Sequence, residues 1–179
     1  MKKIKTPLDN SQIKKLKPGD KVLLTGIIYT ARDQAHKRLA GAINKKKKLP
    51  FNLKGQVIYY CGPTKKPIGK VIGSCGPTTS SRMDEFTPLL LKSGLSGMIG
   101  KGMRSDKVIK TIKKYRAVYF LTYAGCGALL SGYINKSKLL AYRELGPEAI
   151  YQLEVKDFPL IVAVDSRGST IRFTDRQAF

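Results

Sequence analysis

Apolar residues recur along this chain at two spacings, one typical of strands and one typical of helices. Residues 21–29 (KVLLTGIIY) are rich in β-branched residues and predict a strand. Val108 and Ile112 lie on one face of a predicted helix that Ser105 is placed to cap. The two spacings alternate from one end of the chain to the other, which favours a single α/β domain.

The same patterns locate the other elements, although they do not give the order of the strands in a sheet. Further strands or brief extended segments are predicted at residues 56–60, 70–72, 97–99, 117–122, 139–143, 160–164 and 170–173. Further helices are predicted at residues 34–44, 84–92, 125–130 and 146–153. Asp33 stands where it can cap the first of these helices.

The chain has 179 residues, which is the size of one domain. Residues 1–18 are polar and rich in lysine and predict an N-terminal arm or a short lead-in helix, with residues 19–179 as the domain itself. The longest apolar runs reach five residues, as at 160–164, which is too short for a transmembrane helix. No apolar stretch follows the first lysines, so we expect a cytoplasmic protein without a secretory signal.

A formal net charge of +22 suggests nucleic-acid binding, because basic surfaces attract phosphate backbones. However, 25 of the 34 basic residues are lysines, and runs such as residues 45–48 are typical of solvated loops. Base readout favours arginine, and the aromatic residues at 59–60 and 119–120 belong to strand-like segments. A lysine-rich composition is therefore favoured over nucleic-acid binding. Attraction of a small dianion or an acidic partner is a third alternative.

The residues required for several common chemistries are missing or wrongly spaced. His36 is the single histidine, and no G-x-S-x-G turn accompanies it, which argues against a Ser-His-Asp triad. Cys61, Cys75 and Cys126 form no C-x-x-C pair, so a zinc site or an iron–sulfur cluster held by this chain alone is not expected. Glycine motifs of phosphate loops and dinucleotide sites are absent from the sequence.

Three loops instead share the features of an anion site. They are residues 30–33 (TARD), 73–82 (GSCGPTTSSR) and 100–102 (GKG), and each follows a strand-like segment. Cations, hydroxyls and amides at a helix start together bind anions, and arginine grips a carboxylate through two N–H groups. A single hydroxyl before a helix is usually a cap, but residues 78–81 offer four. Three such loops at one end of a sheet would suit a dicarboxylate.

Five segments in order closely resemble the β subunit, or C-terminal domain, of the class I fumarase and L-tartrate dehydratase family. The similarity runs from about residue 19 to residue 164, and the length of the motifs makes it specific. The segments are residues 28–38 (IYTARDQAHKR), 72–84 (IGSCGPTTSSRMD), 97–102 (GMIGKG), 141–150 (AYRELGPEAI) and 154–159 (EVKDFP).

The resemblance implies a fold, a cofactor and a partner. The family reversibly hydrates or dehydrates dicarboxylic acids with a [4Fe–4S] cluster, in which one iron acts as a Lewis acid. The cluster ligands belong to the α subunit or N-terminal domain, so this chain is expected to hold no metal and to work only with that partner. A heterotetramer of two α and two β subunits is expected. The implied fold is a swivelling β/β/α domain that closes over the cluster-bearing part.

The resemblance also assigns roles to individual residues. Thr78 matches the proposed base that removes the C3 proton of the substrate, and Thr79 beside it is a supporting residue. Arg32, Arg82 and Lys101 match the cations that hold the substrate carboxylates.

Three neighbouring residues are expected to play other parts. His36 lies four residues after Arg32 on the same helix face, and we expect it to pack there or to orient Arg32 or Asp33. Asp33 either caps the helix or orients Arg32, with neither alternative favoured. Arg104 is expected at the surface or at a contact with the partner.

Two alternatives to a fumarate hydratase stay open. Within the family, the chain can belong to an L-tartrate dehydratase, whose substrate carries one more hydroxyl than malate. A site that hydrogen-bonds this hydroxyl would discriminate strongly, but the α subunit can supply those groups. Fumarate is favoured of the two. Outside the family, the alternative is a basic nucleic-acid-binding module, for which exposed aromatic residues would be needed.

Overall fold

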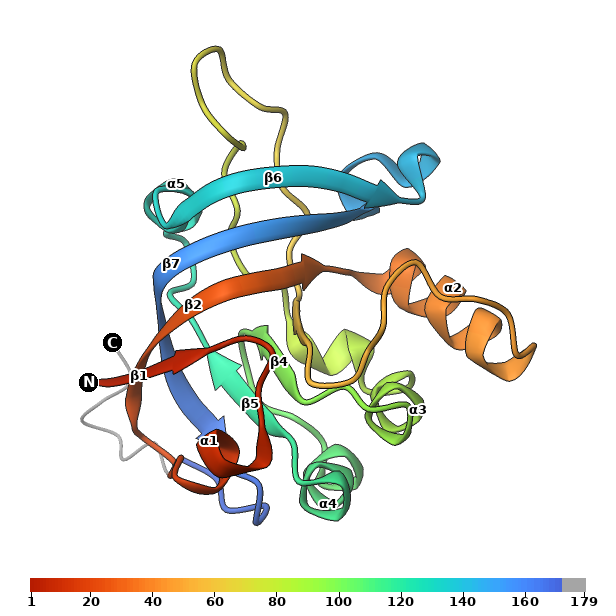
Figure 1. Ribbon diagram of the computed structural model, residues 1–179, viewed down its shortest axis with the longest axis vertical. Helices are drawn as coiled ribbons and strands as arrows, with labels where there is room; N and C mark the ends of the chain where they lie inside the picture. The colour runs from red at the N-terminus through yellow and green to blue at the C-terminus, as the bar shows by residue number, and fades with distance from the viewer. Residues whose placement is uncertain (172–179) are drawn as a thin grey trace.

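The computed structural model describes residues 1–171, and its strands form one sheet that closes on itself (Figure 1). Parallel pairing joins three neighbouring strand pairs, and one long antiparallel strand then connects the first strand of this series to the last. The strands are β1 (Lys2–Lys5), β2 (Lys21–Thr30), β3 (Val57–Tyr59), β4 (Gly97–Gly100), β5 (Val118–Leu121), β6 (Ile134–Ala141) and β7 (Ile150–Val164).

The closed ring contains β2, β3, β4, β5 and β7, in that order. β7 pairs with both β5 and β2 and so completes a five-stranded barrel. β1 lies outside the ring along β2, and β6 lies along the first half of β7. The chain is therefore a single α/β domain, and its barrel brings the ends of three parallel strands together.

Most helices lie on the outer side of the parallel strands, where α2, α3 and α4 follow one another (Figure 1). No helix within residues 1–171 has the length and apolar character needed to cross a membrane. The helices are α1 (Asn10–Lys14), α2 (Asp33–Asn44), α3 (Thr87–Lys92), α4 (Asp106–Tyr115) and α5 (Gly127–Ser131), with 3₁₀ helices η1 (Ser80–Met83) and η2 (Arg143–Glu148).

Alternate residues of the parallel strands supply two separate cores. Tyr59 and Phe120 point into the barrel, whereas Tyr60 and Tyr119 pack on its outer face among residues of α3 and α4. Successive side chains of a strand point to opposite faces, so strands buried on both faces need apolar residues at every position. The expectation that these aromatic residues are core is confirmed, since all four are fully buried.

Residues 1–18 are part of the domain and do not form a separate arm. β1 pairs in parallel with β2, with Ile4 opposite Leu24, and α1 is the short helix expected there. Leu8, Ile13 and Leu16 are buried in the inner core. Apolar residues at these positions are too widely spaced to show as a pattern, which explains why the composition of the segment suggested an arm.

Two predicted elements are wrong. Residues 70–72 belong to a loop that projects from the barrel after β3 (Figure 1), in which Lys70 and Val71 are exposed and Ile72 returns to the core. Residues 146–153, predicted as a helix, contain the start of β7. Gly146 has a positive φ and Pro147 follows it, so η2 ends and Ile150 enters a strand between β2 and β6. Cross-strand pairing outweighs local propensity there.

Two further predictions need smaller changes. The helix predicted at residues 84–92 is shorter: η1 ends at Met83, and α3 begins at Thr87. Thr170 bridges to Val164 as a closing pair of strands requires. Residues 172 and 173 of that predicted strand lie outside the described residues.

Candidate active site

The carboxyl ends of β2, β3 and β4 meet at one edge of the barrel, where the predicted loops 30–33 and 100–102 begin and to which the third, 73–82, returns. The amide of Ala31 donates to the carbonyl of Tyr59 (3.1 Å), and the amide of Tyr60 donates to the carbonyl of Ile99 (2.8 Å). The ladder therefore continues just beyond the strands. The start of α2 and the residues after β4 lie on either side of the chain that leaves β3, at the edge where parallel sheets usually carry ligands.

Thr78 and Lys101 are held together by their backbones. The amide of Thr78 donates to the carbonyl of Tyr60 (2.7 Å), and the carbonyl of Thr78 accepts from the amide of Lys101 (3.3 Å). The carbonyl of Lys101 in turn accepts from the amide of Ser80 (2.9 Å). Thr78 is half-buried, and Thr79 beside it is exposed. The structure thus joins two of the three predicted loops.

Gly100 makes this approach sterically feasible. A Cβ atom on Gly100 would overlap the hydroxyl of Ser80 and lie 2.9 Å from Cδ2 of Tyr60. Real Cβ atoms do not come so close to other atoms, so any larger residue here must push the loop carrying Ser80 away from Lys101.

Asp33 joins the first loop to the second. Nε of Arg82 donates to Oδ1 of Asp33 (2.9 Å), and Nε of Arg32 lies 3.9 Å from Oδ2 of Asp33. One carboxylate thus stands between two predicted substrate-binding arginines. Asp33 is not the helix cap, because Arg32 occupies that position and Asp33 is the first residue of α2.

Arg32 is further placed by two residues that the sequence did not single out. Its side chain runs along Gly62, where a Cβ atom would lie 2.9 Å from Nη1. Nη2 of Arg32 lies 3.7 Å from Oε1 of Glu148, and the other oxygen of Glu148 accepts from the amide of Gln34 (2.8 Å). Glu148 falls within a family-like segment, but no spacing connects it to Arg32 along the chain.

Two polar atoms at this point are buried without a partner. Nε of Arg32 and Oδ2 of Asp33 make no hydrogen bond to other residues of the described chain. Their separation of 3.9 Å fits an ion pair but is too long for a hydrogen bond, and both atoms are closed to solvent. Buried polar groups are seldom left unpaired in folded proteins, so this contact between Arg32 and Asp33 stands out among the polar groups of the site.

His36 is fully buried and contacts Arg32. Its Nδ1 atom lies 2.8 Å from the carbonyl oxygen of Arg32. Because a carbonyl only accepts, we assign the proton to Nδ1 of a neutral ring. Burial lowers the pKa of His36 to about 4, although the hydrogen bond to Arg32 acts in the opposite direction. His36 thus orients the backbone of Arg32 and does not exchange protons near neutral pH.

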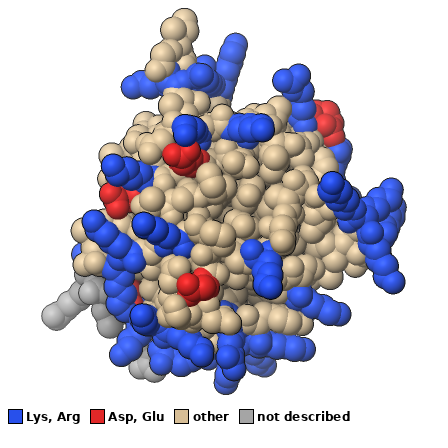
Figure 2. All heavy atoms as spheres, viewed as in Figure 1, with Lys and Arg blue, Asp and Glu red and all other residues tan. Residues whose placement is uncertain are grey.

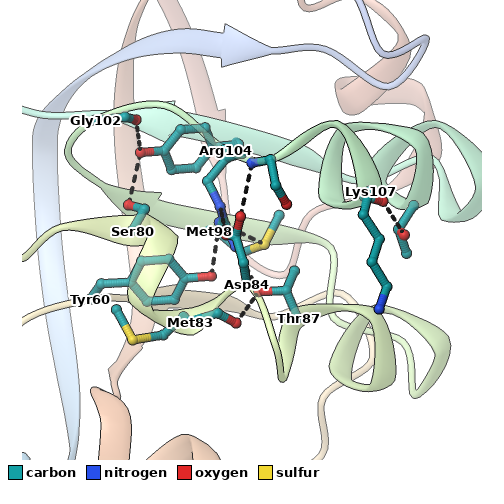
Figure 3. Close-up of polar contacts among 12 residues, drawn as sticks. Tyr60, Ser80, Met83, Asp84, Thr87, Met98, Gly102, Arg104 and Lys107 are labelled. Carbon is teal, nitrogen blue, oxygen red and sulfur yellow. Dashed lines mark hydrogen bonds and ion pairs between the residues drawn. The ribbon is translucent and has the colours of Figure 1, made fainter.

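Arg104 was expected at the surface or at a partner contact, and this is wrong. Its guanidinium group is enclosed between η1, α3 and β4, where it donates to Asp84, Thr87 and Tyr60 (Figure 3). The side chain has no exposed area. Position in a loop suggested exposure, but three acceptors from distant parts of the chain surround this arginine.

The described residues do not fit an iron–sulfur cluster. Within residues 1–171, no group of three or more His, Cys, Asp or Glu side chains is arranged to hold a metal ion. Cys61 and Cys75 are buried with their sulfur atoms 3.0 Å apart, whereas Cys126, which precedes the Gly127 that binds the amide of Cys75, is exposed. The hydrogen bond with Cys75, together with burial, raises the pKa of Cys61 well above its ordinary value. A protonated thiol is a poor iron ligand.

Among the charged side chains on the visible face, basic ones far outnumber acidic ones (Figure 2). They gather in separate groups, with one near the end of α2 and another along the lower edge by α4. Acidic side chains are few and scattered between them (Figure 2). This distribution produces a broad positive potential around the domain, which attracts anions in general.

Comparison with known proteins gives one consistent family. The family described as Fumarase C-terminus matches residues 2–174. A Methanocaldococcus jannaschii protein, provisionally named L(+)-tartrate dehydratase subunit beta, is 42% identical over 170 residues, which are 92% of this chain and 87% of that protein. Fumarate hydratase 2 of Leishmania major is 37% identical over 93% of this chain, and the anaerobic class I fumarate hydratase of Escherichia coli is 40% identical over 89%.

These names describe hydro-lyases, enzymes that add water to a substrate or remove it. The chain belongs to the Fumarase C-terminus family of such enzymes. It spans 30% of the Leishmania protein and 29% of the Escherichia coli protein, but 87% of the subunit from Methanocaldococcus.

Proposed function

We propose that this chain is the β subunit of a [4Fe–4S]-dependent hydro-lyase that reversibly hydrates fumarate to L-malate. The observation that carries the proposal is the link through Asp33 between Arg32 and Arg82, at the edge where Thr78 and Lys101 are paired. Two arginines joined by one carboxylate, at the edge where the backbones of Thr78 and Lys101 pair, suit a substrate with two carboxylates.

Arg32, Arg82 and Lys101 bind the substrate carboxylates. Neutralising the carboxylate beside C3 also makes the C3–H bond more acidic, because the negative charge that develops there spreads onto that carboxylate. These cations therefore contribute to the rate as well as to binding. Arg82 retains an exposed side chain, with 51% of its area open, so its remaining N–H groups are available to a ligand.

Thr78 takes the C3 proton during dehydration and returns it during hydration. A threonine hydroxyl is a weak base, so it needs a neighbouring group that accepts its own proton. His36 does not accept this proton, because it is buried and its Nδ1 atom is hydrogen-bonded to the carbonyl of Arg32. We propose that a carboxylate of the α subunit fulfils this role.

The cluster belongs to the α subunit and supplies Lewis acidity toward the substrate hydroxyl. Two observations support this assignment. The cysteines in the described part of this chain do not fit a cluster, and the chain spans less than a third of the fumarate hydratases that it matches, which leaves the rest of their length for a cluster-bearing part. The site is also open on this chain: Thr79 is exposed, and Met103, which follows Lys101 closely, is 46% exposed. We propose that the domain swivels to close this face over the α subunit in a heterotetramer of two α and two β chains.

Dehydration of L-tartrate is the second candidate. It is favoured by the match over 87% of the Methanocaldococcus protein, whereas the fumarate hydratases match over less than a third of their length. Ser81 is exposed next to Arg82 and offers a hydroxyl near one proposed carboxylate site. A hydrogen bond to the extra hydroxyl of tartrate would separate the two substrates.

The test is anaerobic co-expression with a cluster-bearing α chain, followed by assays of fumarate hydration and tartrate dehydration. Thr78→Ala should lower kcat by about 10²–10⁴-fold, the range for loss of a general base, with the complex intact. Thr111→Ala is the matched control, because Thr111 lies on α4 with its hydroxyl bonded to the carbonyl of Lys107.

The active substrate decides between the two candidates. If the two chains associate but turn over neither substrate, the family fold stands and both candidate substrates are rejected. If the chains do not associate, the proposal that this chain is the β subunit of a two-chain enzyme is rejected. Salt-dependent binding of an oligonucleotide would then test the alternative of nucleic-acid binding.

A further inference from the structure

Arg104 is fixed by protein acceptors on three sides. Its Nε atom donates to Oδ1 of Asp84 (2.7 Å), its Nη2 atom to the hydroxyl of Thr87 (2.6 Å) and its Nη1 atom to the hydroxyl of Tyr60 (3.1 Å), as Figure 3 shows. The guanidinium also lies 5.4 Å from the centre of the Tyr60 ring, within the range of a cation–π contact. This arginine is therefore fully engaged within the chain.

The ion pair connects the two loops that carry the proposed substrate groups. Asp84 follows Arg82 by two residues, and Arg104 follows Lys101 by three. The second oxygen of Asp84 accepts from the amide of Ser105 (2.8 Å). One carboxylate thus binds both a side chain and the backbone of the opposite loop.

Tyr119 makes a second connection between the same loops. Its hydroxyl lies 2.7 Å from the carbonyl oxygen of Gly102 and 2.8 Å from the hydroxyl of Ser80. Because the carbonyl only accepts, the tyrosine donates to Gly102 and the hydroxyl of Ser80 supplies the proton of the other bond. Tyr119 belongs to β5, which pairs with β4 on one side and β7 on the other, so both loops are tied to a strand of the barrel.

We propose that Arg104, Asp84 and Tyr119 are positioning residues, which hold the loop of Thr78 and Arg82 in fixed register with the loop of Lys101. The inference rests on the proposed function of those loops. Arg104 itself has no exposed area and does not touch substrate.

The placement of these groups favours positioning over simple stabilisation. A buried ion pair adds little net stability compared with apolar residues of the same size, because desolvation offsets its attraction. In contrast, a displacement of about 1 Å at a reacting group costs about 10²-fold in rate. The polar network lies where a general base and two carboxylate-binding cations come from separate loops and must keep their geometry.

Tyr119→Phe is the sharpest perturbation. It removes the hydroxyl that joins Ser80 to Gly102 but keeps the ring, which lies 5.1 Å from the Arg104 guanidinium. Removing Arg104 would leave Asp84 unpaired and would test folding instead. Tyr59→Phe is the matched control, since Tyr59 is an equally buried tyrosine whose hydroxyl binds the carbonyl of Cys75 on the inner side of the sheet.

Two measurements use the full chain, alone and assembled with the α subunit. Amide hydrogen exchange should become about tenfold faster in residues 79–83 and 100–104 of Tyr119→Phe, with exchange in β5 unchanged. Tyr59→Phe frees the carbonyl of Cys75 at the start of the loop 73–82 but should leave residues 79–83 and 100–104 unchanged. In the assembled enzyme, KM should rise severalfold and kcat should fall about tenfold, because both the cations and Thr78 lose their register.

A purely structural role predicts a different result. Exchange would then rise uniformly or not at all, and the loss of activity would follow the fraction of folded protein with KM unchanged; either finding would overturn the inference. If the wild-type complex turns over neither substrate, the proposed function fails. Hydrogen exchange in the two loops then decides the positioning claim without any assay of activity.

Discussion

The buried imidazole of His36 should make the domain lose stability as the pH falls from 7 to 5. His36 is the single histidine of the sequence, so no other imidazole titrates in this range. Its ring packs against Tyr60 and Phe86. Burial is the main reason for the low pKa of about 4; the Arg104 cation adds to the shift, whereas the Arg32 carbonyl and Asp33 oppose it.

The size of the effect follows from the two pKa values. Well above pH 6.5 the ring is neutral in both the folded and the unfolded chain, and it contributes almost nothing to the pH dependence. Below that pH the unfolded chain binds a proton that the folded chain does not bind, so the free energy of unfolding falls. With a folded pKa of about 4, the loss is about 2 kcal/mol at pH 5 and about 3 kcal/mol at pH 4.

Urea unfolding followed by circular dichroism at pH 7.5, 6 and 5 measures this loss. His36→Gln keeps an N–H group that can donate to the carbonyl of Arg32 but does not titrate, so its stability should stay level across the same range. Carboxylates with a lowered pKa, such as Asp9 at about 2, act mainly below pH 4 and do not interfere. An equal pH dependence in wild type and His36→Gln would refute the reasoning.

Three further substitutions test the fold and the site. Gly41→Ala should raise the free energy of unfolding by about 0.5–1 kcal/mol, because Gly41 lies inside α2 with open space around it, and a denaturant midpoint measures the gain. Gly100→Ala should lower that free energy by about 1–3 kcal/mol, because the added methyl group overlaps Ser80; equal stability to wild type would contradict the close approach. Asp33→Asn should raise KM severalfold and change kcat less, because it releases Arg82, and an unchanged KM in the assembled enzyme would count against Asp33 as an organiser of the site.

Much of the fold was predictable because its central strands carry strong local patterns. Residues 21–29 form nearly the whole of β2, and the helix predicted at 34–44 begins one residue earlier, at Asp33. Two of the three anion-type loops, residues 30–33 and 100–102, begin at the ends of the parallel strands β2 and β4. The third, residues 73–82, does not follow a strand directly, because β3 ends at Tyr59, but it returns to the same edge where the amide of Thr78 donates to the carbonyl of Tyr60. Their meeting at one edge follows from the parallel pairing of β2, β3 and β4.

The elements that were mispredicted depend on partners far along the chain. β7 runs from Ile150 to Val164 and pairs with three other strands, but its first residues look helical by themselves. β1 has four residues and is a strand because β2 lies beside it. No local pattern contains this information, since a short segment takes the structure that its neighbours in space allow.

The same reasoning explains why Arg104 is buried, against the prediction, whereas Arg82 keeps the exposure that its proposed role requires. Both follow hydroxyl- or glycine-rich loops at the same edge of the barrel. Arg104 meets three protein acceptors and has no exposed area, whereas Arg82 meets one carboxylate, that of Asp33, and keeps half of its side chain open. An arginine can bind a substrate carboxylate only through N–H groups that the protein leaves free. The acceptors that a cation meets in the folded chain, more than its place in a motif, therefore decide whether it binds substrate or holds the loops that do.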